Sequence, residues 1–201
     1  MSYNAVQGGL HMGVNGSSEA DQAMMIQFWQ VGYGQTTVDD LIGAAGLSRT
    51  QFYRQYHSKR VALRRSLVCY QATLDEQLDR LIERERARQT PLPALIAACV
   101  LLPFQSDQWP AGCLMVNLMA ELGTQDAALS AQLQTIYANL QTRFVSLLAP
   151  QAQTLPTTVA EAAASLMQVR SGLQLLAKQA VGGAQLKQQA QTSVNLIMGA
   201  H

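Results

Sequence analysis

The spacing of apolar residues is the feature that most limits what this chain can fold into. After Ser17, apolar residues recur three and four positions apart, β-branched runs are scarce, and the strict alternation of a strand is absent. A spacing of three and four places side chains on one face of an α-helix, whereas a strand needs a period of two. We therefore expect an all-α fold from residue 18 onward.

Composition excludes several classes of protein. Hydrophobic residues make up 48% of the chain and charged residues 13%, which suits a globular core and is too little charge for a disordered chain. The formal net charge is +1, so a polyanion partner would have to bind a local basic patch. Residues 1–17 are rich in glycine and asparagine without periodicity, and we expect a flexible tail there.

Membrane, secreted and metal-binding classes are not favoured. Cys69, Cys99 and Cys113 have the spacing of neither a disulfide framework nor a zinc cluster, and the histidines are too scattered to hold a metal. No apolar run approaches the roughly 20 residues that span a bilayer, and no basic segment precedes an apolar one at the N-terminus. We expect a cytoplasmic protein that needs no metal and no cofactor.

Capping residues, glycines and prolines divide the chain into helices. Each short helix near the N-terminus begins at a serine or threonine, and the first two end at a glycine. The expected caps and stops are Ser18, Gly32, Thr37, Gly46, Ser48 and Ser58. From Thr90 onward charge becomes sparse and prolines punctuate the chain, so a second, apolar domain is expected with helices near 92–106, 114–123, 126–149, 157–181 and 184–198.

Residues 37–65 combine a structural motif with local charge. Two short helices joined by a tight glycine-containing turn are the helix-turn-helix arrangement, whose second helix lies in the DNA major groove. This stretch carries six basic and two acidic residues, a local charge of +4. A solvated basic surface would explain the charge alone, but caps, turn and spacing together favour DNA binding.

The third expected helix separates a buried side from an outward side. Leu47, Phe52 and Tyr56 should be buried. The outward residues suit DNA, because arginine can bind guanine with two bonds, glutamine can bind adenine, and tyrosine or lysine can reach phosphate. These outward residues are Arg49, Thr50, Gln51, Tyr53 and Gln55.

The segment "FWQVGYGQTTVDDLIGAAGLSRTQFYRQYHSKRVAL" resembles the DNA-binding domain of the TetR/AcrR family of bacterial transcriptional regulators, over roughly residues 20–68. Tyr56 departs from the family pattern, in which phenylalanine is common, and should pack equivalently. The resemblance implies phosphate contacts, base-reading positions and flanking contacts. The implied phosphate contacts are Thr37, Tyr53 and Lys59. The implied base-reading positions are Arg49, Thr50 and Gln51, and the flanking contacts are Arg54 and Gln55.

The resemblance also implies an architecture. It predicts an all-helical homodimer on a palindromic double-stranded DNA operator, with a helix-turn-helix domain over residues 18–66 and a regulatory and dimerisation domain over residues 67–201. Apolar residues of the last two helices are expected to form a four-helix bundle between subunits, with packing inside one chain as the alternative. They are Ala163, Leu166, Met167, Leu173, Val194, Leu196 and Ile197.

Cys113 is the candidate sensor of the second domain. Pro110 and Gly112 place it at the start of a helix, where amide groups and the helix dipole favour a thiolate, whereas Cys69 and Cys99 lie in helix interiors and should be core residues. "GCLMVNLMAE" and "GLQLLAK" resemble segments of the NemR-type regulators that sense electrophiles and hypochlorite. That resemblance implies Cys113 as the oxidised residue and Lys178 as its amine partner.

Two alternatives remain open at this stage. The Gly-Cys pair can be a packing feature, with Lys178 complementing a helix C-terminus and a small apolar molecule as the effector. A helical small-molecule carrier is the alternative to a regulator. An enzyme is not expected, because the sequence shows no Ser-His-Asp set, metal cluster or phosphate-binding glycine loop.

Overall fold

The computed structural model describes residues 19–102, 109–123 and 125–199. The predicted N-terminal tail and the Ser18 cap lie outside these residues. Within them the chain forms nine α-helices and one short 3-10 turn, with no strand, so the expected all-α fold is confirmed. No helix among these residues is long and apolar enough to cross a membrane.

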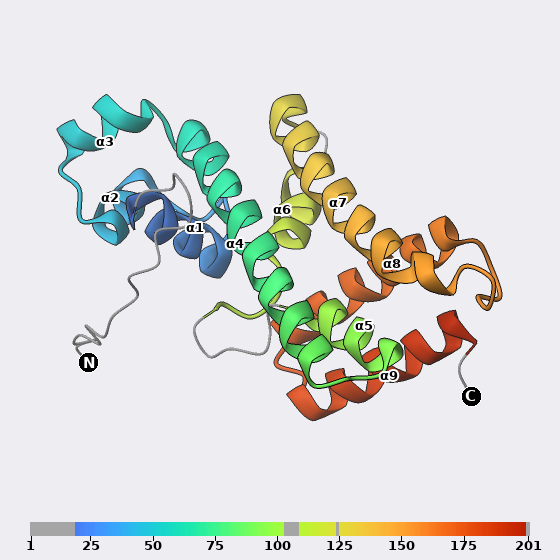
Figure 1. Ribbon diagram of the computed structural model, residues 1–201. Helices are drawn as coiled ribbons and strands as arrows, with labels where there is room; N and C mark the ends of the chain where they lie inside the picture. The colour runs from blue at the N-terminus through green and yellow to red at the C-terminus, as the bar shows by residue number, and fades with distance from the viewer. Residues whose placement is uncertain (1–18, 103–108, 124, 200–201) are drawn as a thin grey trace.

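The first three helices form one end of the molecule (Figure 1). They are α1 (Glu19–Val31), α2 (Val38–Ala45) and α3 (Arg49–Tyr56). Gly32 follows α1 with φ +93°, and Gly46 ends α2 in the left-handed conformation with φ 63°, which glycine adopts without a steric penalty. Both predicted stops are therefore confirmed.

The long helix α4 (Lys59–Ala87) begins after its predicted cap, Ser58, and runs from this end of the molecule to the other (Figure 1). The expected domain boundary between residues 66 and 67 falls inside it. It packs against α1, α5 and α7. A single helix therefore joins the predicted DNA-binding part to the rest of the chain.

The remaining helices enclose the second part of the core. They are α5 (Leu92–Leu101), α6 (Leu114–Leu122), α7 (Ala127–Leu148), α8 (Val159–Lys178) and α9 (Gly183–Met198), with the turn η1 (Ala149–Gln151) after α7. α5 packs on α8 and α9, and α7 packs on α6 and α8. Buried residues of both parts belong to one continuous hydrophobic cluster.

The helix expected over 92–106 is shorter than predicted. α5 ends at Leu101, and Leu102 has an extended backbone with ψ 136°. The ring of a proline disfavours helical geometry in the residue before it, and Leu102 precedes Pro103 in the sequence. The other four helices predicted after Thr90 agree with the structure within two or three residues at their ends.

Candidate functional site

Two capping boxes hold the helix-turn-helix together. The Thr37 hydroxyl accepts a hydrogen bond from Asp40 N at 3.1 Å, and the Asp40 carboxylate accepts one from Thr37 N at 2.7 Å. Ser48 and Gln51 form the same reciprocal pair at the start of α3. The Thr37 N–H and hydroxyl also hold the pKa of Asp40 below its usual value, which keeps the carboxylate charged at this cap.

The two faces of α3 are separated as predicted, with one difference. Phe52 and Tyr56 are fully buried, and their rings stack with centroids 5.4 Å apart. Leu47, which was expected on the same buried side, is only half-buried, because it lies in the turn before the helix begins. The buried ring pair anchors α3 on the core and leaves its other face to solvent.

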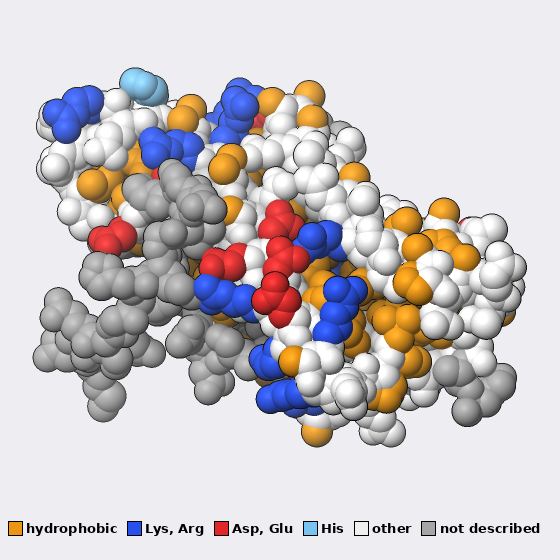
Figure 2. All heavy atoms as spheres, in the orientation of Figure 1, with side chains coloured by type: hydrophobic (Ala, Val, Ile, Leu, Met, Phe, Trp, Pro, Cys, Tyr) orange, Lys and Arg blue, Asp and Glu red, His pale blue; other side chains and the backbone are white. Residues whose placement is uncertain are grey.

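The outward face of α3 gathers the predicted DNA contacts. Its exposed side chains are Arg49, Thr50, Gln51, Tyr53, Arg54 and Gln55. The Tyr53 side chain is 43% exposed although it is a large aromatic residue. Basic side chains gather over α3 and the start of α4, at the upper left of Figure 2. His57 is the C-cap of α3.

Four of the predicted DNA contacts already have partners inside the chain, and Thr37 is one of them through its capping box with Asp40. Arg49 forms an ion pair with Asp39 in which both side chains are mostly exposed. Gln51 accepts from Ser48 N in the capping box. Lys59 donates to the Thr36 carbonyl at 2.7 Å and lies 4.3 Å from the centre of the Tyr33 ring.

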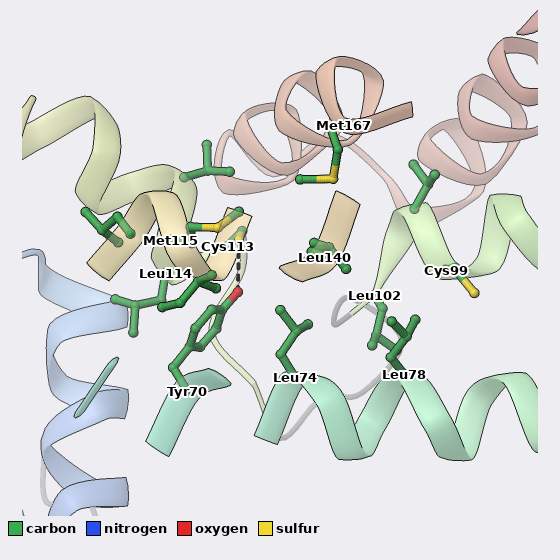
Figure 3. Packing of buried hydrophobic residues seen from close by; sticks show 14 of the residues in the cluster. Tyr70, Leu74, Leu78, Cys99, Leu102, Cys113, Leu114, Met115, Leu140 and Met167 are labelled. Carbon is green, nitrogen blue, oxygen red and sulfur yellow. Dashed lines mark hydrogen bonds between the residues drawn. The ribbon is translucent and has the colours of Figure 1, made fainter. Parts of the chain in front are cut away.

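Cys113 is the N-cap of α6, as predicted, but it is completely buried. Its Sγ lies 2.9 Å from the Tyr70 hydroxyl, with which it shares a hydrogen bond (Figure 3). Burial raises the pKa of Tyr70 well above its usual value, and Arg170 opposes that shift. Tyr70 therefore stays protonated and is able to donate to sulfur. The prediction assumed that Cys113 lies at an open, solvent-exposed helix N-terminus. The thiol is enclosed by other residues instead.

Lys178 lies beside the Cys113 loop at its Cβ, and no hydrogen bond joins it to Cys113 among the described residues. A Cβ added to Gly112 would lie 3.5 Å from Lys178 Cβ and 3.3 Å from the Gln174 carbonyl oxygen. The Lys178 side chain is exposed at the end of α8, while Cys113 is buried. Among the described residues, Tyr70 is the hydrogen-bond partner of the thiol. Gly112, with φ +87°, allows the loop to approach α8 this closely.

Arg170 is a residue that the sequence reasoning missed. It lies in α8 and is only 1% exposed, and its Nη1 donates to the carbonyls of Cys99 and Val100 at 3.1 and 2.9 Å. Its Nε and Nη2 are buried without a hydrogen-bond partner. The spacing in the sequence could have predicted its burial. Residue 170 lies three or four positions from Leu166, Met167 and Leu173, which form the buried face of α8.

The other two cysteines are core residues, as expected. Cys69 and Cys99 are 1% and 0% exposed. Burial raises the pKa of Cys99 to about 12, with Arg170 acting in the opposite direction. No group of three or more potential metal ligands occurs within the described part of the chain.

Glu121 links α6 to the helix-turn-helix. Its carboxylate accepts hydrogen bonds from the backbone N–H groups of Tyr33, at 2.9 Å, and Gly34. A Cβ at Gly34 would lie 2.9 Å from Glu121 Oε1, so a larger residue at that position would make the carboxylate shift. α6 thus carries Cys113 at its N-terminal end and a contact with the loop between α1 and α2 at its C-terminal end. In the sequence, Glu121 is only the last residue of the segment GCLMVNLMAE, and nothing there indicates its partners.

Two further contacts join the same parts of the molecule. Arg60 at the start of α4 forms an ion pair with Asp126, the N-cap of α7. The Gln132 side chain donates to the Arg64 carbonyl at 3.0 Å. The helix-turn-helix is therefore tied to α6 and α7 by polar contacts as well as by α4.

The residues expected at a subunit interface are mostly occupied elsewhere. Five of the seven are buried within the one chain and cannot line such an interface, so this part of the prediction is wrong; they are Ala163, Leu166, Met167, Leu173 and Val194. Leu196 is 69% exposed and Ile197 is half-buried. The apolar surface left on α8 and α9 also includes Leu175 and Leu176, which are 45% and 36% exposed.

Comparison with known proteins agrees with this geometry. Residues 22–63 match the family model described as bacterial regulatory proteins, tetR family, so the N-terminal domain is a TetR-type domain. The transcriptional repressor ComR of Escherichia coli K12 is 28% identical over 125 residues, which are 59% of this chain and 56% of ComR. The chain thus matches little more than half the length of this relative.

Solved structures share the fold of the whole chain. The TetR-family regulator CifR, solved as a cysteine mutant with a 26-base-pair operator DNA, aligns with a TM-score of 0.71 at 21% identity over 88% of this chain and 93% of its own. The reduced form of Escherichia coli NemR aligns with a TM-score of 0.70 at 17% identity over 90% of this chain and 96% of its own. ComR and CifR are named as regulators of transcription and not as enzymes.

Proposed function

We propose that this chain, whose N-terminal domain is of the TetR type, is a transcriptional repressor that binds a palindromic DNA operator as a homodimer. The observation that carries the proposal is the exposed polar face of α3, a helix that begins at a capping box and follows a second capped helix, α2. The complex of CifR with operator DNA supports it, because that chain has the same fold.

Each residue of this face has a proposed role. Arg49, Thr50 and Gln51 read base edges, because they occupy the first turn of the helix that enters the major groove. Thr37, Tyr53 and Lys59 bind phosphate and fix the position of the domain on the DNA. Arg54 and Gln55 make flanking contacts. The exposed ion pair of Arg49 with Asp39 contributes only about 0–1 kcal/mol, so DNA can replace it.

DNA binding is tested with an operator selected from a random library. Arg49→Ala should weaken operator binding about 10-fold to 100-fold and relax base preference, because a bidentate base contact contributes about 1–3 kcal/mol. Tyr53→Phe should weaken all sequences about equally, because phosphate carries no sequence information. Arg84→Ala, at the far end of α4, is the matched control. A wild-type protein that binds every DNA sequence equally would favour a carrier instead.

Homodimerisation is proposed through the exposed apolar residues of α8 and α9. Leu175, Leu176 and Leu196 are the described candidates. Leu196→Glu should convert the dimer to a monomer in sedimentation, because it buries a charge in an apolar contact. Val68→Glu, at a 59% exposed site on α4, is the control and should leave the dimer intact. A wild-type monomer at operator-binding concentrations would contradict this assignment.

The proposed inducing signal is oxidation of Cys113 with Lys178 as partner. The Cys113 thiolate, hypochlorous acid and the neutral Lys178 amine yield a sulfur–nitrogen bond, chloride and water; sulfur loses two electrons and chlorine gains them. The approach of Gly112 to Lys178 supports the pairing, and the structural neighbours include a reduced form and cysteine mutants. Burial of Cys113 means that the loop must open before the amine can reach it.

Mass spectrometry of hypochlorite-treated protein tests this signal while operator binding is followed in parallel. A cross-link between Cys113 and Lys178 should appear as DNA is released. Cys113→Ser should bind the operator and resist release, whereas Cys99→Ser should respond like the wild type. Release that persists in Cys113→Ser would exclude the oxidation mechanism. The remaining candidate is a small apolar effector, which the unsatisfied Arg170 favours.

A further inference from the structure

The guanidinium of Arg170 is a buried positive charge, and it forms no ion pair with any residue that the structure describes. Among these residues, the Cys99 and Val100 carbonyls both accept from Nη1, and the guanidinium also interacts with the Tyr70 hydroxyl, which is uncharged. A buried charge is normally paired, because its removal from water is otherwise strongly unfavourable.

The unsatisfied atoms of Arg170 lie on one edge. Nε and Nη2 carry the two parallel N–H groups that a carboxylate can accept with both of its oxygens, and both atoms are buried and unpartnered. The two α5 carbonyls hold the other side of the group, so the free edge is fixed in place. The fold therefore positions this edge of the guanidinium to bind a carboxylate.

The neighbouring side chains do not supply the missing negative charge. Tyr70 stays protonated because burial raises its pKa, and Cys99 stays a thiol because burial raises its pKa to about 12. Two more buried polar atoms in this region lack partners, Gln174 Oε1 and Asn117 Nδ2. Gln174 lies one turn after Arg170 on α8, and both residues contact carbonyls at the end of α5.

The surroundings are otherwise apolar. Met115, Leu140 and Met167 lie around the Cys113–Tyr70 pair between α4, α6, α7 and α8 (Figure 3). Methionine side chains adapt to guests of different shape because they are unbranched and flexible. A cavity beside the Tyr70 ring, lined also by Trp29 and Trp109, has a volume of only about 10 Å³. A guest larger than a water molecule must therefore move helices apart as it enters.

We infer that Arg170 anchors an apolar monocarboxylate in the regulatory part of the chain, with the carboxylate on the free Nε and Nη2 edge and the apolar body among the methionines and leucines. The class of ligand follows from one buried cation in an apolar environment. This inference deepens the small-effector form of the proposed function and does not require oxidation of Cys113. Entry of the ligand between α4, α6 and α8 would act on the helix that bears Glu121.

The test compares acids with uncharged analogues of the same shape. Butyrate, octanoate and benzoate are each titrated against their amides, with tryptophan fluorescence as the readout, because Trp29 packs edge-on against Tyr70 at 5.2 Å. At least one acid should bind the wild-type protein ten-fold or more tightly than its amide. No preference for any acid over its amide would overturn the inference.

Variants identify the anchor. Arg170→Met should bind acid and amide equally, and it should fold, because an apolar side chain in place of an uncompensated buried charge is often tolerated. Arg170→Lys keeps the charge but loses the two-point geometry, so acid binding should weaken several-fold. Arg143→Met, which removes a surface ion pair with Asp79, is the matched control. Unchanged acid preference in folded Arg170→Met and Arg170→Lys would overturn the inference.

Binding and regulation are measured separately. The titrations use the full-length protein without DNA, so the outcome stands even where operator binding fails. The bound acid is then added to the operator complex, and release that Arg170→Met abolishes would identify the acid as an inducer. Acid binding in Cys113→Ala should equal that of the wild type, since the anchor does not use the thiol.

Discussion

Replacement of Glu121 tests whether α6 is physically coupled to the DNA-binding domain. The carboxylate accepts from the N–H groups of Tyr33 and Gly34, 88 and 87 residues away in sequence. A negative charge in the last turn of a helix is itself unfavourable by about 0.3–1 kcal/mol, so these two bonds are what make the position favourable for a carboxylate. Glu121→Gln removes the charge and turns an N–H group toward a backbone donor.

The magnitude follows from the number and exposure of these bonds. A hydrogen bond to a charged group contributes about 1.5–3 kcal/mol, and solvent exposure at this site reduces that value, so the pair should contribute about 1–2 kcal/mol. That energy corresponds to about a 5-fold to 30-fold change in the equilibrium between closed and open states of the loop. Glu121→Ala should give the upper part of this range because both acceptors are lost.

Amide hydrogen exchange measures the opening directly. A peptide over residues 30–36 should exchange about 5-fold to 30-fold faster in Glu121→Gln than in the wild type, while global unfolding changes little. Glu76→Gln, which removes an exposed ion pair with Arg80 on α4, is the control and should leave this peptide unchanged. Induced protein, oxidised or ligand-bound, should show the same faster exchange at residues 30–36 if α6 moves on induction.

Two results would refute this reasoning. Equal exchange of the peptide in wild-type and Glu121→Gln protein would show that the carboxylate does not hold the loop. Faster exchange throughout the chain in Glu121→Gln would show that the residue stabilises the fold as a whole rather than one contact between its parts.

Three further predictions concern stability and reactivity. Gly112→Ala should destabilise the protein by about 1–3 kcal/mol in thermal unfolding, because φ is +87° and the new Cβ would lie 3.3 Å from the Gln174 carbonyl. The control is Gly43→Ala, in open space within α2, which should stabilise the protein by about 0.5–1 kcal/mol. Equal effects of the two substitutions on stability would contradict this explanation. Hydrogen bonds from Thr157 and Thr158 hold the pKa of Glu161 at about 2, below its unfolded value of roughly 4.3, so the stability that Glu161 contributes is present above that value and is lost as pH falls through about 2. The difference in melting temperature between wild type and Glu161→Gln should therefore shrink as pH is lowered from 5 to 2. A difference that stays constant over this range would contradict the stabilising role of the Glu161 carboxylate. Iodoacetamide should leave Cys99 unmodified in native protein at pH 8, because burial raises the pKa of its thiol to about 12. Modification of Cys99 in native protein as fast as in denatured protein would disprove this prediction.

The sequence by itself determined the helices and the helix-turn-helix. The Thr37 and Ser48 caps each bond a residue three positions later, and Gly46 supplies a left-handed turn that depends on its own backbone. Interactions this local can be predicted from residue type and spacing, because the chain holds the partners near each other in any fold. The outward face of α3 followed from the same periodicity. The end of α5 was misplaced because the restriction that Pro103 imposes on Leu102 was not applied.

Only the tertiary structure decided what surrounds each buried polar group. The hydrogen bond between Tyr70 and Cys113 joins residues that are 43 positions apart in the sequence. The hydrogen bonds from Arg170 to the end of α5 span 71 and 70 residues. Periodicity shows that a residue faces the core but not which carbonyl, thiol or loop it meets there. For the same reason, the apolar residues of α8 and α9 could not be divided by sequence between an internal core and a subunit interface. The packing angles of the helices set these contacts, and those angles result from all the side chains of the core together.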